Sequence, residues 1–282
     1  MLVLTRNESL HIARCLCSAF RLSKNVYVLD SKSSDSTATL AKNLGATVIS
    51  GEFNGFAQKL NWGLDNIVFP TPWVLRLDAD EILSEELVAN LPRLLDEVEN
   101  DVSGVYLRRQ LWFMGQWIRH GDMYPTYSMR LWRRGAVVCE ARELDEHMML
   151  RFGRAIRHEL DIIDDPLFTL ATWIEKHNGY STLEADSAKK ARSDDSQLMK
   201  PSLFGTSPQR RRWLKVNFFY RLPPFARPIL YFFYRYVIRL GFLDGRIGFI
   251  FHFMHGLWYR CLVDAKMLEK SRARSLAGRE AP

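Results

Sequence analysis

The sequence lacks several features that mark secreted, zinc-binding and membrane-spanning proteins. Its four cysteines include no pair at metal-site spacing, because one residue rather than two separates Cys15 from Cys17. No charged leader followed by an apolar core opens the chain, so we expect no signal peptide. We interpret the cysteines as reduced thiols of a cytoplasmic protein. Charged residues interrupt the long apolar runs before they reach the roughly 20 residues that a bilayer span requires.

Acidic residues are scarce in one part of the chain. The net charge is +7, but residues 206–274 hold 14 Lys or Arg against three acids, a local net charge of +11. The same region is rich in aromatic residues, with sixteen of them between Trp213 and Tyr259. The overall content of 47% hydrophobic and 25% charged residues is typical of a globular protein. A mildly acidic body and a basic, aromatic C-terminal segment indicate two tasks in one chain.

Short apolar runs alternate with helical periodicity through the first third of the chain. The expected strands are 2–4, 25–29, 46–49 and 73–77, and the expected helices follow each of the first three. This alternation predicts a parallel sheet flanked by helices. From Gly104 onward we expect strands at 105–107 and 129–132, and a helix over 168–190.

Acidic residues follow three of the predicted strands. Glu8, Asp30 and Asp78 each come directly after an apolar run, so all three should lie along one rim of the sheet. In open α/β sheets, ligands bind in the crevice beyond the carboxyl ends of the strands. The carboxylates are therefore expected where a ligand would bind.

The stretch Asp78-Ala79-Asp80-Glu81 ends the fourth predicted strand abruptly. Two carboxylates at this position suit a hard cation such as Mg²⁺ or Mn²⁺, which takes oxygen ligands and often shares them with a bound diphosphate. A structural alternative is that Asp78 or Asp80 caps a helix that begins near Ile82. The motif alone does not decide between the two.

Three motifs together resemble a known family. Thr5-Arg6-Asn7-Glu8 follows the first strand, VLDSKSSDST contains the end of the second, and Asp78-Ala79-Asp80 follows the fourth. In order and spacing they resemble the family-2 glycosyltransferases, inverting enzymes with the GT-A fold that use nucleotide diphosphate sugars. The resemblance covers residues 2 to about 190. It implies a GT-A-like, mostly parallel α/β sheet flanked by helices.

The resemblance also implies roles for individual residues. Thr5 and Glu8 should line the nucleoside pocket, and Asp30 should hydrogen-bond the base. Asp78 should reach the ribose or the metal, and Asp80 should ligate Mg²⁺ or Mn²⁺ between the phosphates.

Three further positions matter for donor and metal binding. Lys59, in the segment GFAQKLNWGLDN, matches a part that lies beside the nucleotide in relatives, although it could equally be a solvated helix lysine. His147 and His158 could each supply a third metal ligand, whereas a lone histidine is more often structural.

Inverting transfer also requires a base near the acceptor hydroxyl. Asp145-Glu146-His147 falls where the family places that base. We favour Glu146 over Asp145, because relatives often end this motif in an acid at that register. Neighbouring residues of a strand point to opposite faces, so we expect one of the two to face the site. A surface acidic pair is the alternative.

The C-terminal region admits three interpretations. Helices with arginine on one side and aromatic residues on the other lie in the headgroup plane of a membrane, which is the interpretation we favour. A packed core or homodimer face is the second. Nucleic-acid binding is the third, but runs such as 229–233 would expose more apolar surface than an RNA groove needs. The segment also resembles the C-terminal part of bacterial family-2 enzymes that build lipopolysaccharide core or lipid-linked polysaccharide.

These observations combine into one hypothesis. Residues 1–192 form a GT-A-like nucleotide-sugar glycosyltransferase domain, 193–212 a linker, and 213–282 an amphipathic helical membrane-associating region. The protein would be a metal-dependent hexosyltransferase that moves a sugar from a nucleotide diphosphate to a lipid-linked or lipopolysaccharide acceptor. We expect the nucleotide of the donor to be UDP. We expect it at the cytoplasmic face of the inner membrane, without nucleic acid, and leave a homodimer open.

Two other functions remain as alternatives. A nucleotidyltransferase would typically open with a glycine-rich, basic phosphate loop, and LTRNESLH has no glycine. A non-catalytic nucleotide-sugar-binding protein would keep the binding residues and lack turnover.

Overall fold

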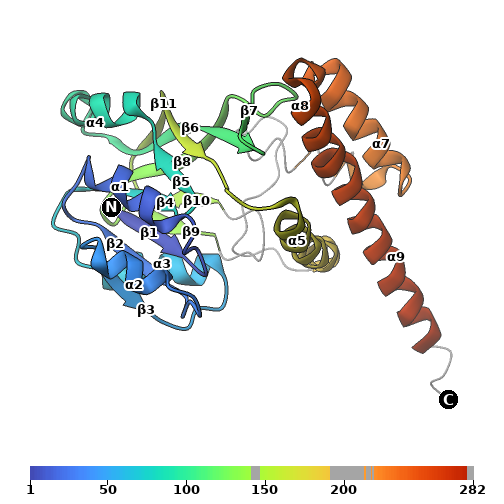
Figure 1. The fold of residues 1–282 in the computed structure, drawn as a ribbon, viewed down its shortest axis with the longest axis horizontal. Coiled ribbons are helices and arrows are strands. Elements are labelled where there is room, and N and C mark those ends of the chain that lie inside the picture. The colour runs from blue at the N-terminus through green and yellow to red at the C-terminus, as the bar shows by residue number, and fades with distance from the viewer. Residues whose placement is uncertain (141–146, 191–212, 214–216, 218, 278–282) are drawn as a thin grey trace. The chain divides into compact units, whose positions relative to one another are not determined.

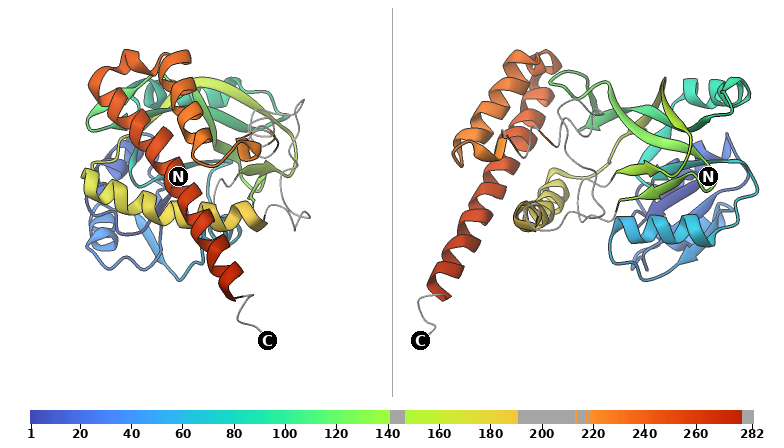
Figure 2. Two further views of the ribbon diagram at one scale, coloured as in Figure 1. Left: turned by 90° about the vertical axis from the view of Figure 1, so that its right-hand side faces the viewer. Right: turned by 180° about the vertical axis from the view of Figure 1, so that it is seen from behind.

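The computed structural model describes residues 1–140, 147–190, 213, 217 and 219–277 (Figures 1 and 2). The described chain divides into two compact units. The first runs to residue 167 without residues 120–122, and the second contains residues 120–122 and the part from 168 onward. The predicted linker 193–212 lies outside the described residues, and the predicted domain limits stay a prediction.

The first unit is built on a sheet whose N-terminal half is parallel. These strands run in the order β3 (Thr47–Ser50), β2 (Tyr27–Asp30), β1 (Leu2–Thr5) and β4 (Trp73–Asp78). The helices between them are α1 (Ile12–Phe20), α2 (Thr37–Asn43) and α3 (Phe56–Asn66). The parallel register places Thr5 beside Asp30 and Leu4 beside Asp78, so the three strands end at one edge.

Apolar side chains fill both faces of this sheet. Val3, Val28 and Leu77 point to the face that α1 and α4 (Glu85–Glu97) cover. Alternate residues such as Leu4 and Leu29 point to the face that α3 covers. Strands buried on both faces have continuous apolar sequences, which is why the sequence identifies β1, β2 and β4 clearly.

The other half of the sheet is mixed. Beyond β4 come β8 (Thr126–Arg133), β6 (Val102–Phe113), β11 (Arg154–Asp164) and β5 (Glu81–Leu83), with β7 (Gln116–Ile118) paired to β6. A separate hairpin joins β9 (Val137–Cys139) to β10 (Met148–Leu150). Strand β8 is antiparallel to β4 and β6, so β6 runs in the direction of β4. The expected α/β class with a helical C-terminal region is confirmed.

The segment after Asp80 is a strand and not the start of a helix, which bears on the helix-cap explanation of the acidic motif. Residues 81–83 form β5, which pairs with β11, and Ile82 therefore does not begin a helix. Helix α4 starts at Glu85, and its N-cap is Ser84, whose Oγ accepts the backbone N–H of Leu87 at 3.1 Å. Neither Asp78 nor Asp80 caps this helix, so the capping explanation of the acidic motif is wrong.

The second unit is helical. Its elements are α5 (Leu170–Lys190), η1 (Phe219–Arg221), α7 (Ala226–Phe233), η2 (Tyr234–Ile238), η3 (Gly241–Asp244), α8 (Gly245–Phe251), η4 (His252–Trp258) and α9 (Tyr259–Ala277). Helix α9 continues directly from η4 and runs toward the C-terminus in both views of Figure 2. Helix α5, expected in the first domain, groups with these helices. Among the described helices, none is both long enough and apolar enough to cross a membrane.

Two arginines of this unit do not lie where the amphipathic pattern predicts. Arg227 and Arg235, expected on a charged outer face, are 4% and 3% exposed. Arg227 pairs with the buried Asp264, and Nε of Arg235 donates to the carbonyl oxygen of Gly121 at 2.7 Å. These arginines hold the helical unit together from inside, because an ion buried in protein needs a partner.

Candidate active site

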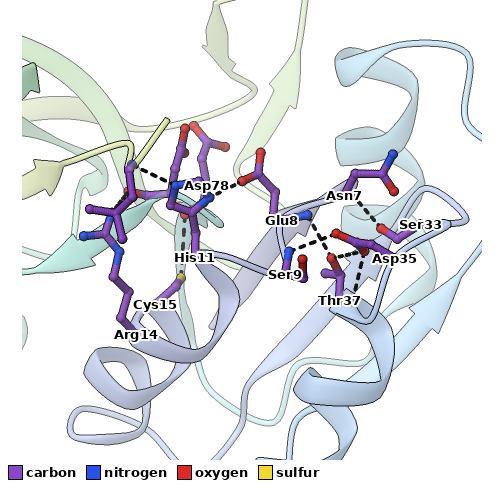
Figure 3. Close-up of polar contacts among 12 residues, drawn as sticks. Asn7, Glu8, Ser9, His11, Arg14, Cys15, Ser33, Asp35, Thr37 and Asp78 are labelled. Atoms are coloured by element: carbon purple, nitrogen blue, oxygen red, sulfur yellow. Dashed lines mark hydrogen bonds and ion pairs between the residues drawn. The ribbon is translucent and has the colours of Figure 1, made fainter. Parts of the chain in front are cut away.

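The loops that follow β1 and β2 are interlocked by side-chain hydrogen bonds. The backbone N–H of Asn7 donates to Ser33 Oγ at 2.8 Å, and Asn7 Oδ1 accepts the N–H of Ser34 at 2.8 Å. Asn7 has a φ of 54°, a left-handed conformation that asparagine tolerates better than most residues. Figure 3 shows the two loops side by side, with their polar side chains directed at each other. The first two motifs therefore form one structural feature.

Asp35 holds the start of α2 against the first loop. Its Oδ2 accepts the N–H of Ser9 at 3.1 Å, and its Oδ1 accepts the N–H of Thr37 at 3.0 Å (Figure 3). Burial alone would raise the pKa of Asp35, but the hydrogen bonds from Thr37 and Ser9 lower this pKa to about 2. The carboxylate is thus ionised at neutral pH and fixed in position.

Asp30, at the end of β2, is 1% exposed. Its Oδ2 accepts the N–H of Ser33 at 3.0 Å, and the hydroxyls of Ser33 and Ser50 also point to the carboxylate. The carboxylate therefore organises the loop after β2. Its expected hydrogen bond to a base stays a prediction.

Glu8 is oriented by a buried histidine that the sequence did not single out. His11 is 0% exposed, and its Nε2 accepts the backbone N–H of Leu167 at 2.9 Å. Because Nε2 is the acceptor, the neutral ring carries its proton on Nδ1, which donates to Glu8 Oε2 at 2.6 Å (Figure 3). Glu8 is thereby held near the carboxyl end of β1, where the sequence predicts a ligand-binding site.

Lys59 is buried at the same edge of the sheet. It lies on α3, is 6% exposed, and its Nζ donates to the carbonyl oxygen of Thr5 at 2.6 Å. Burial lowers the pKa of Lys59 to about 8, although the carboxylates of Asp30, Asp78 and Glu8 act in the opposite direction. A solvated helix lysine is therefore excluded, and the structure brings Lys59 together with four of the predicted site residues.

Asp78 belongs to a network of charged groups. Its Oδ2 accepts from Arg76 at 2.9 Å and from Arg130 at 3.0 Å, and Arg130 also pairs with Glu81. Glu81 Oε2 accepts the backbone N–H of Asp78 at 2.9 Å. Arg76, Arg130 and Glu81 are at most 6% exposed, whereas the side chain of Asp78 is 32% exposed. Burial raises the pKa of Glu81, and Arg76 opposes this shift.

Asp80 is held by its backbone. Its carbonyl oxygen accepts from Arg14 and from the N–H of Asp165, both at 3.4 Å, and Arg14 also forms an ion pair with Asp165 at 2.7 Å. These contacts tie the turn after β4 to α1 and to the end of β11. The side chain of Asp80 is partly exposed.

The carboxylates at this turn suit a hard divalent cation that receives most of its ligands from a bound substrate and water. The carboxylates of Asp78 and Asp80 supply oxygen, which Mg²⁺ and Mn²⁺ prefer, and Mg²⁺ usually completes its shell with phosphate oxygens and water. Within the described residues, no three His, Cys, Asp or Glu side chains gather into a group that could hold a metal by itself. The protein residues thus fit a shared site, with ligands from a bound diphosphate, rather than a closed protein cage.

The two histidines considered as third ligands lie on other strands. His147 precedes β10, and its Nδ1 is 3.7 Å from Oε2 of the buried Glu140. His158 lies in β11, with a buried Nδ1 that has no partner among the residues described. Within the described part of the chain, neither histidine joins the two aspartates in a group that could hold a metal by itself. The ligand role of His147 stays a prediction.

The predicted bases Asp145 and Glu146 lie outside the described residues. The residues on either side of the segment pair with each other, because the N–H of Glu140 donates to the carbonyl oxygen of His147 at 2.9 Å. Asn61 of α3 makes two hydrogen bonds to the backbone of Cys139, at 2.8 and 2.9 Å. Strand β9 is thereby fixed to the helix that carries Lys59.

Sequence reasoning missed His11, Arg76 and Arg130. A signal existed for Arg76, which stands inside the apolar run Trp73–Asp78, since a buried arginine needs a carboxylate partner. Arg130 lies far in the chain from Asp78 and Glu81, so no local spacing reveals it. His11 stands three residues after Glu8, a spacing that could have suggested the pair, but its other partner, Leu167, is distant in the chain.

Comparison with known proteins supports the three motifs as a group. Residues 1–155 match the family model described as glycosyl transferase family 2. An uncharacterized glycosyltransferase of Rickettsia prowazekii is 40% identical over 85 residues, and the match covers 30% of this chain and 28% of that relative. The chain thus matches less than a third of the length of this relative.

Two longer similarities are weaker in identity. The lipopolysaccharide core biosynthesis glycosyltransferase LpsC of Rhizobium meliloti is 24% identical over 197 residues, covering 65% of this chain and 69% of that protein. The mannosyltransferase PcManGT of Pyrobaculum calidifontis, solved with GDP-Man and Mn²⁺, is 16% identical with a TM-score of 0.47. That match covers 95% of this chain and 84% of the mannosyltransferase.

Proposed function

This chain belongs to glycosyl transferase family 2, and from that premise we propose that it transfers a sugar from a nucleotide diphosphate sugar, UDP-linked by preference, with inversion. One observation carries the proposal. Glu8, Asp30, Lys59 and Asp78 converge from β1, β2, α3 and β4 on the edge where the parallel strands end. A buried amine beside several carboxylates suits the recognition of a polar nucleotide rather than a structural core.

The residues at this edge divide into two groups by position. Thr5, Glu8 and Asp30 would bind the nucleoside, with Glu8 presented by the Nδ1–H of His11. Asp78, held by Arg76 and Arg130, would meet the ribose or the metal, and Asp80 would ligate Mg²⁺ or Mn²⁺. When bound, the metal offsets the charge that develops on the leaving diphosphate. The ammonium of Lys59 adds positive potential to the same edge.

The acceptor hydroxyl must attack the anomeric carbon from the face opposite the diphosphate. A carboxylate that accepts the hydroxyl proton makes this attack possible at neutral pH. We assign this role to Glu146, with Asp145 as the other candidate, because relatives often carry an acid at this register. The strands on either side, β9 and β10, pair with each other, and β9 is bound to α3. The assignment rests on the family pattern.

The acceptor is proposed to be a lipid-linked sugar or a lipopolysaccharide precursor. The similarity to LpsC, a lipopolysaccharide core biosynthesis glycosyltransferase, supports this class of acceptor. Such acceptors lie in a membrane, and the basic, aromatic C-terminal unit supports an enzyme that works at the cytoplasmic face of the inner membrane. Neither a nucleic-acid partner nor a homodimer is needed for this reaction.

A panel of nucleotide diphosphate sugars tests the proposal. With Mn²⁺ or Mg²⁺ present, we expect one UDP-sugar to raise the Tm of the protein and to be hydrolysed slowly, with faster turnover when a glycolipid acceptor is added. Stabilisation without any turnover would indicate a binding protein instead. If nucleoside triphosphates stabilise the protein and no nucleotide sugar does, glycosyl transfer is wrong.

A further inference from the structure

The helical unit has an inverted distribution of polar and apolar side chains. Along α7, η2 and the segment to residue 253, the exposed large apolar residues are Phe225, Ile229, Leu230, Phe233, Tyr234, Val237, Ile238, Leu240, Phe242, Leu243, Phe249 and Phe253. Ile238 is 68% exposed and Phe233 is 58% exposed. Exposed apolar surface of this extent on a protein in water marks a binding face.

Charged and polar groups of the same segments are buried. Arg227 pairs with Asp264, Arg235 donates to the carbonyl oxygen of Gly121, and Asp244 accepts from both the backbone N–H and Nδ1 of His120 at 2.9 and 2.7 Å. Each of these ionised groups has its partner inside the unit. The outer face of α7 and η2 can therefore leave water without carrying an unpaired charge with it.

The exposed residues of α7 and η2 form one stripe. Ile229, Phe233 and Val237 recur every four residues, and Leu230, Tyr234 and Ile238 lie beside them. The two elements are continuous over 226–238, so the helical segment that carries the stripe is about 20 Å long at about 1.5 Å per residue. That length is too short to cross the roughly 30 Å hydrocarbon core of a bilayer, but it is enough for a helix that lies within one leaflet.

The charges that do reach the surface identify the partner. Between residues 219 and 253 the exposed charged residues are Arg221, Arg239 and Arg246, and the one acid, Asp244, is buried. Arg239 is partly neutralised by Asp122, at 2.9 Å. An apolar stripe bordered by basic groups is complementary to a membrane with anionic headgroups, whereas a symmetric protein interface would need acids to meet these arginines.

We propose that the α7–η2 stripe inserts below the headgroups of one leaflet, so that the enzyme is monotopic rather than held at the surface by charge alone. This inference rests on the membrane location in the proposed function and specifies how the membrane is bound. It differs from an amphipathic helix lying among the headgroups, because the central Arg235 is buried in the protein and cannot reach lipid phosphates.

Vesicle binding of the full chain separates insertion from surface attraction. We expect binding to neutral phosphatidylcholine vesicles that persists at about 0.5 M salt, since apolar insertion is not screened. Ile238→Glu should weaken this binding about tenfold or more, because a carboxylate would have to enter the apolar region. Val68→Glu is the matched control, since Val68 is 84% exposed in the first unit, and it should leave binding unchanged. Binding only to anionic vesicles and its loss in salt would overturn insertion.

A depth measurement gives an independent readout. Cys17 is exposed and Cys261 is partly exposed, so both are replaced by serine before Ile238→Cys is labelled with an environment-sensitive fluorophore. We expect a blue shift with vesicles and quenching by nitroxides on the acyl chains, and neither effect for label at Val68→Cys. A label at 238 that stays in water while the protein binds vesicles would overturn insertion.

Two further outcomes keep the alternatives apart. If the lipid-free chain is a dimer that Ile238→Glu converts to a monomer, and the chain binds no vesicle, the stripe is a dimer face and insertion is wrong. Stabilisation by nucleotide sugars is measured on the same variant. If vesicles bind with the expected depth but no nucleotide sugar stabilises the protein, insertion stands and the proposed reaction fails.

Discussion

The ammonium of Lys59 donates to the carbonyl oxygen of Thr5 at 2.6 Å, and this contact joins helix α3 to the end of the first strand. Both residues are buried, at 6% and 3% exposure. The contact places a positive charge among Glu8, Asp30 and Asp78, where a nucleotide would bring further negative charge. Burial opposes the ionised form of this lysine, so we expect its position to serve ligand binding rather than stability.

The first prediction concerns the pH dependence of stability. The pKa of Lys59 is lowered from 10.5 to about 8 by burial, so between these values the unfolded chain binds more protons than the folded chain. The unfolding free energy therefore rises with pH across this window. Relative to Lys59→Met, the wild-type chain should gain about 3 kcal/mol between pH 7 and pH 11.

Chemical unfolding at several pH values tests this prediction. The comparison with Lys59→Met removes the contributions of other groups, because these are shared by both proteins. If the difference in unfolding free energy between the two proteins does not change from pH 7 to pH 11, burial does not lower the pKa of Lys59 in the folded chain. Bound nucleotide should raise the folded-state pKa of Lys59 toward 10.5, so the window should narrow from its low-pH side and the gain in stability should shrink.

The second prediction concerns the metal. Asp80→Asn removes a hard anionic ligand while keeping its size, so transfer should fall by two or more orders of magnitude and the fold should remain. Activity of the wild-type enzyme should vanish in EDTA and return with Mn²⁺ or Mg²⁺. Asp96→Asn, at an exposed position of α4, is the control and should keep full activity. Full activity in EDTA would contradict a metal-dependent mechanism.

The third prediction concerns the base. Asp145→Asn and Glu146→Gln each remove one candidate without adding charge. One of the two variants should lose about two or more orders of magnitude in kcat, and both should bind the donor normally in a thermal-shift titration. Near-normal turnover by both variants would place the base elsewhere.

Much of the N-terminal half could be predicted from the sequence, for a physical reason. Strands β1, β2 and β4 are buried on both faces, so their apolar runs are local signals, and the acids that follow them fall on one edge. Strand β11 could not be found in this way. Its sequence, RAIRHELDIID, is highly charged, because its first residues are partly exposed and its Asp161 pairs with Arg108 across the sheet.

The contacts within the site were beyond sequence reasoning for the same reason. His11 acts on Glu8 only because Leu167, distant in the chain, fixes its tautomer. The burial of Arg235 was also not predictable, since helical periodicity places it on a face without saying what covers that face. Pairings of this kind depend on tertiary structure.

The last prediction concerns the ion network that supports Asp78. Arg130→Met would leave Glu81 buried without one of its cationic partners, and breaking a buried pair costs about 3–5 kcal/mol. Adding Glu81→Gln should restore part of the lost stability, because the uncompensated charge is then removed. Arg21→Met at the exposed pair with Glu85 is the control, and it should change stability little, since solvent screens that pair.

A functional readout distinguishes a positioning role from a purely structural one. The double variant Arg130→Met with Glu81→Gln should fold, yet Asp78 would lose one of the two guanidinium groups that orient it, so donor affinity should stay below that of the wild type. Chemical unfolding gives the stability and nucleotide-sugar titration the donor affinity. Both are measured on the wild type, Arg130→Met, the double variant and Arg21→Met. If the double variant regains stability and full donor affinity together, Arg130 supports the fold alone and Arg76 is sufficient to hold Asp78.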